Sequence, residues 1–169
     1  MTMFGTKRTV FEQDKYKILR ASLRDAPILS ALTKGDWSER VAISQRRIKD
    51  NPNQIADDLR VGGALVLYRS NLPVAALSYV PAKDGSWELR RLGVTKTFSG
   101  RGFTTLLLDS LEKLARKNSV NSIRIPVDTY SPQFKAYFEK LGFSVESERT
   151  FATVFAGALQ PIRMRKHIG

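Results

Sequence analysis

The stretch from 89 to 108, LRRLGVTKTFSGRGFTTLLL, constrains the fold of this chain more than any other. Residues 89–94 have the apolar character of a strand, and Gly100 and Gly102 mark a turn directly after it. From Phe103 onward, leucines recur on one face of an amphipathic helix whose other face is charged. The sequence therefore predicts a strand, a glycine-rich turn and a helix in direct succession.

The first turn of this helix is a candidate site for an anion. Its backbone N–H groups lack intrahelical acceptors, and the helix dipole places partial positive charge there. Gly100 and Gly102 have no Cβ atoms to obstruct a phosphate, and Arg101 adds a formal charge. The same glycines would also suit a tight turn without a ligand. A Walker loop is excluded because no Gly-Lys-Ser/Thr follows, and the third glycine of the dinucleotide fingerprint is absent.

Length and composition indicate one domain of 169 residues. We expect a polar lead-in over 1–14, partly disordered and anchored only by Val10 and Phe11, and then a single domain over 15–169. The chain has no apolar run long enough for a membrane span and no signal-peptide pattern, so we expect a cytoplasmic protein. With no cysteine, and one histidine near the C-terminus, we expect no metal site and no thiol nucleophile.

Charge points to polyanionic partners. Lys and Arg number 28 against 16 Asp and Glu, which gives a formal net charge of +12. A phosphate-rich cofactor and RNA or DNA are both compatible with this excess, and so is a cationic surface without a specific partner.

Hydrophobic periodicity and turn residues predict alternating helices and strands along the chain. Strands are expected over 16–23, 64–68, 73–80, 87–94, 122–127, 143–147, 150–156 and 162–168. Helices are expected over 28–34, 36–49, 52–59, from Phe103, and over 132–141, the last ending at Gly142.

Two segments together resemble the GNAT superfamily of acetyl-CoA-dependent N-acyltransferases. The first is 92–104, LGVTKTFSGRGFT, which is similar to the family's strand, loop and glycine-rich turn. The second is 137–143, YFEKLGF, which is similar to its helix ending in tyrosine-x-lysine-x-glycine-phenylalanine. The resemblance extends from Tyr16 to the end. It implies an α/β (α+β) fold: a mixed, mostly antiparallel sheet splayed between its fourth and fifth strands, 87–94 and 122–127, with helices on both faces.

The resemblance also implies where acetyl-CoA binds. Pantetheine would pair with the backbone of the strand like an added strand, the pyrophosphate would lie on amides 100–105, and the Val94 amide would polarise the thioester carbonyl. The cofactor-binding residues expected are Leu92, Gly93, Val94, Ser99, Gly100, Arg101, Gly102, Phe103, Thr104, Thr105, Ser131, Phe138 and Lys140.

Glu88 is the expected general base, since branches of the family carry a catalytic glutamate at this point of the strand. Strand alternation places it on the same side as Leu92 and Val94. An ordinary surface glutamate paired with Arg90 or Arg91 is the alternative interpretation. Asp128, after the fifth strand, is the second choice.

The chain departs from the family pattern at four positions. Phe138 occupies the place of the usual acid tyrosine, so Tyr137, one residue earlier, or Tyr130, in the loop after the fifth strand, is the candidate acid. Packing in the core or the groove is the alternative interpretation of Tyr137. Ser99 replaces Arg or Gln, and we expect its hydroxyl to cap the helix. Thr104 replaces Gly or Ala and is expected to add bulk near the phosphates. Ser131 replaces asparagine and is expected to cap its own helix.

The function implied is transfer of an acetyl group from acetyl-CoA to a primary amine of a small molecule, peptide or protein. Residues 34–59 and 156–161 are the expected acceptor segments. One alternative is acetylation of an amine on RNA, such as aminoacyl-tRNA, whose turnover would fall with rising salt. Another is a non-catalytic module that binds acyl-CoA or nucleic acid. A monomer and a homodimer are both compatible with the sequence.

Overall fold

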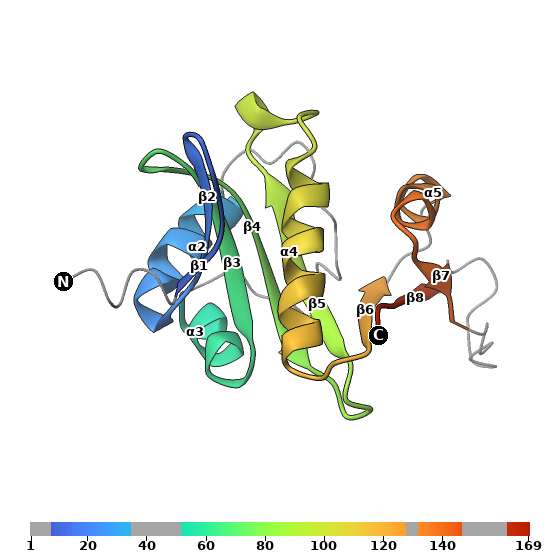
Figure 1. Cartoon of the computed structure of the whole chain (residues 1–169). Helices are drawn as coiled ribbons and strands as arrows, with labels where there is room; N and C mark the ends of the chain where they lie inside the picture. The colour runs from blue at the N-terminus through green and yellow to red at the C-terminus, as the bar shows by residue number, and fades with distance from the viewer. Residues whose placement is uncertain (1–7, 35–51, 128–131, 147–161) are drawn as a thin grey trace.

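The computed structural model of the chain describes residues 8–34, 52–127, 132–146 and 162–169 (Figure 1). The strands are β1 (Thr9–Gln13), β2 (Tyr16–Arg20), β3 (Gly63–Arg69), β4 (Leu72–Pro81), β5 (Trp87–Val94), β6 (Ser122–Val127), β7 (Ser144–Val145) and β8 (Ile162–His167). The helices are η1 (Leu23–Asp25), α2 (Ala26–Lys34), α3 (Pro52–Val61), η2 (Lys96–Phe98), α4 (Phe103–Lys117) and α5 (Pro132–Lys140). The helix predicted over 36–49 and the strand predicted over 150–156 lie outside the described residues.

The eight strands form one sheet in the order β1-β2-β3-β4-β5-β6-β8-β7. Every neighbouring pair is antiparallel except β5 and β6, which are parallel. The mixed, mostly antiparallel sheet expected from the sequence is therefore confirmed. A parallel pair needs a crossover connection, and α4 supplies it between β5 and β6.

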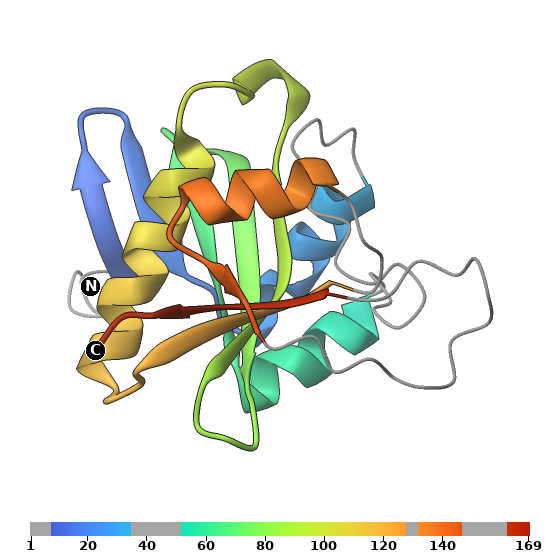
Figure 2. The ribbon, with the colours of Figure 1, turned by 90° about the vertical axis from the view of Figure 1, so that its right-hand side faces the viewer.

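Helices cover both faces of the sheet. α4 lies against one face of β3 to β5, and α2 and α3 lie against the other (Figure 2). The larger core, on the α4 face, contains Leu77, Leu89, Leu107 and Phe138, whereas Ile55 of α3 centres a smaller core on the other face. None of the helices in the described ranges is both long and apolar enough to cross a membrane.

The sheet begins earlier than the sequence suggested. Thr9–Gln13, inside the lead-in expected to be partly disordered, forms the edge strand β1 and pairs antiparallel with β2. Val10 and Phe11, the two expected anchors, pack against the larger core. Short length and polar neighbours concealed this strand, because Glu12 and Gln13 break the apolar pattern.

The sheet splits between β5 and β6. Only Trp87↔Ile123 and Glu88↔Arg124 are paired, although β5 continues to Val94. β6 then pairs along its whole length with β8, and this half of the sheet turns away from β5 (Figure 1). The splay expected between 87–94 and 122–127 is therefore present, and it leaves the β6-facing edge of β5 beyond Glu88 outside the ladder.

A β-bulge interrupts β5 at Arg90. Tyr79 of β4 is opposite Leu89, but the preceding β4 residue, Ser78, is opposite Arg91, so Arg90 is the extra residue. A bulge of this kind reverses the alternation of side chains on either side of it. Leu89 consequently shares a face with Leu92, although the two are three residues apart.

An ionic cluster joins the two halves of the sheet where the gap closes. The guanidinium of Arg165, on β8, donates to Asp84 in the β4–β5 turn (2.6 Å), to Ser122 on β6 (2.7 Å) and to Glu146. Asp84 also accepts hydrogen bonds from the Ser86 hydroxyl (2.6 Å) and backbone N–H (3.0 Å). The hydrogen bonds from Ser86 and Arg165 hold the pKa of Asp84 well below its ordinary value of 3.8.

Because the folded-state pKa of Asp84 is lowered, its contribution to stability is present above the unfolded pKa and is lost as the pH falls. We expect Asp84→Asn to lower the free energy of unfolding at pH 7, by about 1 kcal/mol or less since the side chain is exposed to solvent. The difference from wild type should shrink as the pH falls below about 5. Urea unfolding at several pH values measures it. Asp57→Asn, in an exposed pair with Arg60, is the control, and a pH-independent difference would contradict the assignment.

Candidate functional site

The glycine-rich turn lies between η2 and α4, and both of its glycines have left-handed backbone conformations. Gly102 is the N-cap of α4 with a φ of 80°, and Gly100 has a φ of 73°. These left-handed values favour glycine strongly over any residue with a Cβ. A Cβ built on either glycine would meet no atom within 4 Å. The space in front of the turn is therefore open, and the N-cap makes no side-chain hydrogen bond that would occupy the first-turn amides.

Aromatic rings support this turn from below. The Phe103 ring is buried and packs against Tyr16 of β2 and Phe98 of η2, with centroids 5.1 and 6.3 Å apart. The Arg101 guanidinium lies over the Phe98 ring, 5.0 Å from its centroid. Phe103 can therefore offer a ligand its backbone amide but not its ring. Arg101 and Thr105 are exposed at the helix start.

Two expectations about this turn are wrong. Ser99 does not cap α4, because its hydroxyl donates to the carbonyl of Lys96 at 3.0 Å and the cap position belongs to Gly102. Thr104 adds no bulk in front of the helix, since its side chain is only 3 % exposed and turns into the protein. The extra atoms of Thr104 thus fill the core under the turn rather than the space above it.

The unpaired edge of β5 presents backbone groups to the gap. The Thr95 N–H donates to the Val74 carbonyl of β4 at 2.9 Å. In an antiparallel ladder, hydrogen-bonded and non-hydrogen-bonded pairs alternate, so the next pair, Val94 with Ala75, does not exchange bonds. The Val94 N–H consequently points away from β4 and toward the gap between β5 and β6.

Glu88 and Arg90 lie at the closed end of the gap. Their side chains approach to 3.5 Å between Glu88 Oε1 and Arg90 Nη1, and both are partly buried. The expectation that Glu88 shares a face with Leu92 and Val94 is wrong, because the bulge at Arg90 reverses the alternation. Register places Glu88 opposite Val80 and beside Arg124, on the face away from α4.

The other predicted side chains separate into two groups. Phe138 is 0 % exposed and packs edge-on against Phe143, so its ring has no surface with which to contact a cofactor. Tyr137 is 37 % exposed and Lys140 is exposed, both on α5. Tyr130, Asp128 and Ser131 lie outside the described residues.

Sequence reasoning named Arg90 only as an alternative ion-pair partner of Glu88, and the structure contains that pair. It did not identify Arg124. Both flank Glu88, Arg90 through the 3.5 Å ion pair and Arg124 through the parallel register. An arginine-rich strand gives no sign of which side chain faces the gap, because a bulge has no sequence signature here. An apolar pocket of about 380 Å³ also lies on this face, between α2 and the starts of β4 and η2. It is lined by Ile28, Ala31, Leu32, Leu72, Pro73 and Thr95.

The geometry suits a long ligand with an anionic part and an extended, amide-bearing part. The open glycine turn at the start of α4 can accept phosphate oxygens on backbone N–H groups. The β5 edge can pair with an extended chain as a further strand would. Glu88 then stands on the far side of the same strand, next to the gap.

Comparison with known families agrees with this geometry. Residues 29–143 match the model of the Acetyltransferase (GNAT) family, which is more than half of the chain. No curated protein matches the sequence. The family uses acetyl-CoA as its acyl donor.

Solved structures show the same fold at low sequence identity. The PaiA N-acetyltransferase from Thermoplasma acidophilum in complex with coenzyme A is 17% identical, with a TM-score of 0.70, over 91% of this chain and 99% of that chain. The ribosomal-protein-S18-alanine N-acetyltransferase from Escherichia coli is 18% identical, with a TM-score of 0.67, over 91% and 94%. A ribosomal L7/L12 alpha-N-protein acetyltransferase in complex with coenzyme A is 13% identical, with a TM-score of 0.68, over 95% and 98%.

The buried position of Phe138 can be tested by adding a hydroxyl. We expect Phe138→Tyr to lower the free energy of unfolding by about 1–3 kcal/mol, because the new hydroxyl would be buried without a partner. Phe11→Tyr, in the half-buried edge strand β1, is the matched control and should change stability little. Urea denaturation measures both. Unchanged stability of Phe138→Tyr would mean that the ring edge faces open space.

Proposed function

Since the chain belongs to the acetyltransferase (GNAT) family, we propose that it transfers an acetyl group from acetyl-CoA to a primary amine by direct attack. The observation that carries the proposal is the continuity of the site. The unpaired edge of β5 and the open turn at Gly100 and Gly102 are separated only by the short helix η2, so one extended ligand can contact both.

Backbone groups do most of the cofactor binding in this proposal. The amides from Gly100 to Thr105 receive the pyrophosphate, with Arg101 adding a charge, and the backbone of Leu92 to Val94 pairs with the pantetheine arm. The Val94 N–H, directed into the gap, donates to the thioester oxygen, where negative charge develops during attack. Phe138 contributes only packing beneath this surface, and Lys140 is a candidate contact at the end of α5.

Acetyl-CoA supplies an acyl thioester whose C–S bond breaks as the amine nitrogen forms the new C–N bond, and the leaving thiolate takes up a proton. Glu88 accepts the proton that the amine loses, directly or through water. Tyr137 on α5 and Tyr130 are the candidate donors to the thiolate. An amine reaches Glu88 from the α2 and α3 face of the sheet, so donor and acceptor approach β5 from different sides.

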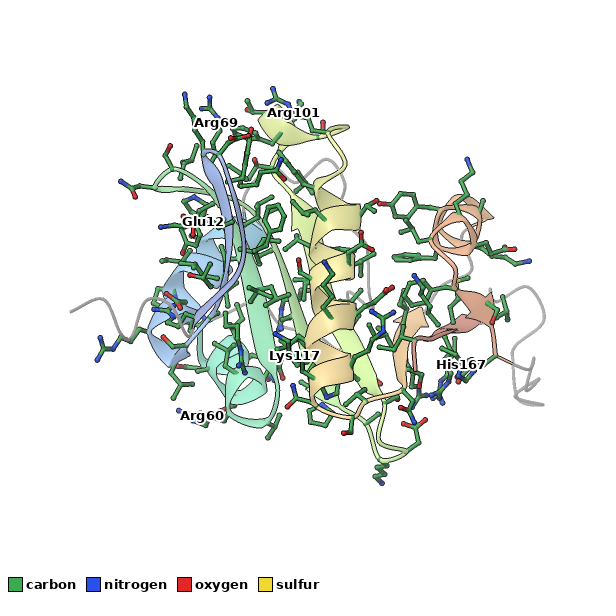
Figure 3. The ribbon with its side chains drawn as sticks, viewed as in Figure 1. Glu12, Arg60, Arg69, Arg101, Lys117 and His167 are labelled. Atoms are coloured by element: carbon green, nitrogen blue, oxygen red, sulfur yellow. The ribbon has the colours of Figure 1, made fainter. Side chains whose placement is uncertain are left out.

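Small-molecule, peptide and protein amines are all candidate acceptors. Two of the similar solved structures are named as acetyltransferases of ribosomal proteins. An amine carried on RNA is the second candidate, favoured by the formal net charge of +12. The exposed cations Arg69 and Arg101 lie at the same end of the molecule, near the start of α4 (Figure 3).

The glycine turn can be tested by adding an acidic side chain. Gly102→Asp should weaken acetyl-CoA binding about 10- to 100-fold, because a carboxylate at a left-handed position both strains the turn and repels phosphate. Gly85→Asp is a closely matched control: its φ is 87°, and a Cβ there also meets nothing within 4 Å, but it lies in the β4–β5 turn. Isothermal titration of acetyl-CoA measures both variants.

Two outcomes would contradict this cofactor site. Equal binding by wild type and Gly102→Asp would place the phosphates elsewhere. Absence of binding to the wild type would remove the acetyl donor from the proposal and favour a role in nucleic-acid binding.

Replacement of the proposed base, Glu88, should slow acetyl transfer without weakening the binding of acetyl-CoA. We expect Glu88→Gln to lower kcat about 10²- to 10⁴-fold, the usual contribution of general base catalysis, while acetyl-CoA binding stays near the wild-type value. Glu12→Gln, on the exposed edge strand far from the gap, is the control (Figure 3). Initial rates with a panel of primary amines measure the effect.

Unchanged turnover in Glu88→Gln would mean that Glu88 is not the base and that another group or water accepts the proton. Wild-type protein that binds acetyl-CoA but acetylates no amine in a broad panel would instead favour a non-catalytic acyl-CoA-binding module.

A further inference from the structure

One polar atom near Glu88 lacks a partner. Across the part of the chain that the structure describes, Arg90 Nε is the only fully buried side-chain nitrogen or oxygen with no hydrogen-bond partner. A buried guanidinium N–H without an acceptor costs free energy, so its retention calls for an explanation. The neighbouring arginine is different: Arg91 donates to Asp58 at 2.7 Å and to Ser78 at 3.3 Å.

The contact between Arg90 and Glu88 does not fill this need. It joins Arg90 Nη1, not Nε, to Glu88 Oε1, and at 3.5 Å it is longer than a well-formed charge-assisted hydrogen bond. Both groups therefore keep capacity for a closer partner. Residues two apart along a strand share a face, and this places Arg90 beside Glu88.

Positive charge exceeds negative charge around this pair. Arg124 stands beside Glu88 in register, and its own contacts to Asp84 and Glu146 are both 3.9 Å long. Those two carboxylates are held closely by Arg165. One carboxylate is thus flanked here by two loosely paired guanidiniums, which favours a ligand that brings both an amine and an anion.

We propose that the acceptor is a free α-amino acid, whose carboxylate binds Arg90 while its amine meets Glu88. This inference rests on the proposed acetyltransferase function and deepens it. In an α-amino acid one carbon separates the two groups, so the nitrogen and a carboxylate oxygen lie about 3 Å apart. That spacing matches the 3.5 Å between the Glu88 and Arg90 atoms.

The substrate would then replace the loose ion pair by two better contacts. The Arg90 guanidinium, on a side chain that is 33 % exposed, donates to the carboxylate oxygens, as arginine does in charge-assisted pairs. Glu88 accepts from the ammonium and removes its proton, the neutral nitrogen forms the amide bond to the acetyl carbon, and the thiolate leaves with a proton. The product is an N-acetyl amino acid, which keeps its carboxylate on Arg90.

The test compares acceptors that differ only in the carboxylate. The twenty L-amino acids and their carboxamides are offered with acetyl-CoA, and kcat/KM is measured for each matched pair. Carboxamides imitate the first residue of a peptide chain. We expect wild type to prefer the best acid over its amide about 10- to 100-fold. Arg90→Gln should bring this ratio close to one, and Arg90→Lys, which keeps a charge without the fork, should give an intermediate ratio.

Lys117→Gln removes an exposed positive charge at the end of α4 and should leave the wild-type ratio intact. A wild-type ratio near one, or amides acetylated faster than acids, would overturn the amino-acid assignment, leave the acetyltransferase proposal standing and point to peptide N-termini. A ratio that survives in Arg90→Gln would overturn the role of Arg90.

A binding measurement separates the two proposals if nothing is acetylated. N-acetyl amino acids and N-acetyl amino-acid amides are titrated into the protein with coenzyme A present. Acid-selective binding that is lost in Arg90→Gln would support the carboxylate site although the proposed reaction had failed. Absence of selectivity in this titration would overturn the carboxylate site as well.

Discussion

Parallel pairing between β5 and β6 stops after two residue pairs, and the rest of the site depends on this interruption. Had the ladder continued, the backbone of Leu92 to Val94 would be hydrogen-bonded to β6 and closed to any ligand. Instead, β6 forms its hydrogen-bonded ladder with β8, and a gap opens between β5 and β6. The ionic cluster around Arg165 ties the two halves together where the gap closes, so the opening has a fixed base.

Two irregularities of the backbone, the glycine turn and the bulge at Arg90, determine which groups lie on each face of the sheet at β5. The glycine turn leaves the space in front of the start of α4 open. The bulge at Arg90 places Glu88 on the face away from α4, opposite to the face of Leu92. A regular β5 would have placed Glu88 with Leu92 in the apolar core under α4, where an ionised carboxylate is costly. The bulge that interrupts the alternation of side chains thus keeps the Glu88 carboxylate out of the apolar core and beside the gap.

Much of the fold could be predicted from sequence, because the strongest signals were local. Strands 87–94 and 122–127, the helix from Phe103 and the left-handed Gly142 agree with the expected positions. The errors have physical causes. β1 lacks an apolar alternation, and the face of Glu88 depends on a bulge set by pairing with β4 rather than by residue type. Ser99 bonds locally to Lys96, which the family pattern does not specify. Sequence predicted the conformation of the glycine turn better than the surroundings of Glu88, because glycine preferences are local and side-chain pairing is not.

The rings of Tyr16, Phe98 and Phe103 beneath the glycine turn have a consequence for binding kinetics and entropy. Glycine-rich loops are conformationally free in isolation, and ordering one around a ligand reduces affinity. Here the packed rings hold the turn in shape before any ligand binds, so the entropic cost of ordering belongs to folding rather than to binding. The N-terminal hairpin that carries Tyr16 is thereby part of a preorganised receptor, although it lies far from the reacting atoms in sequence.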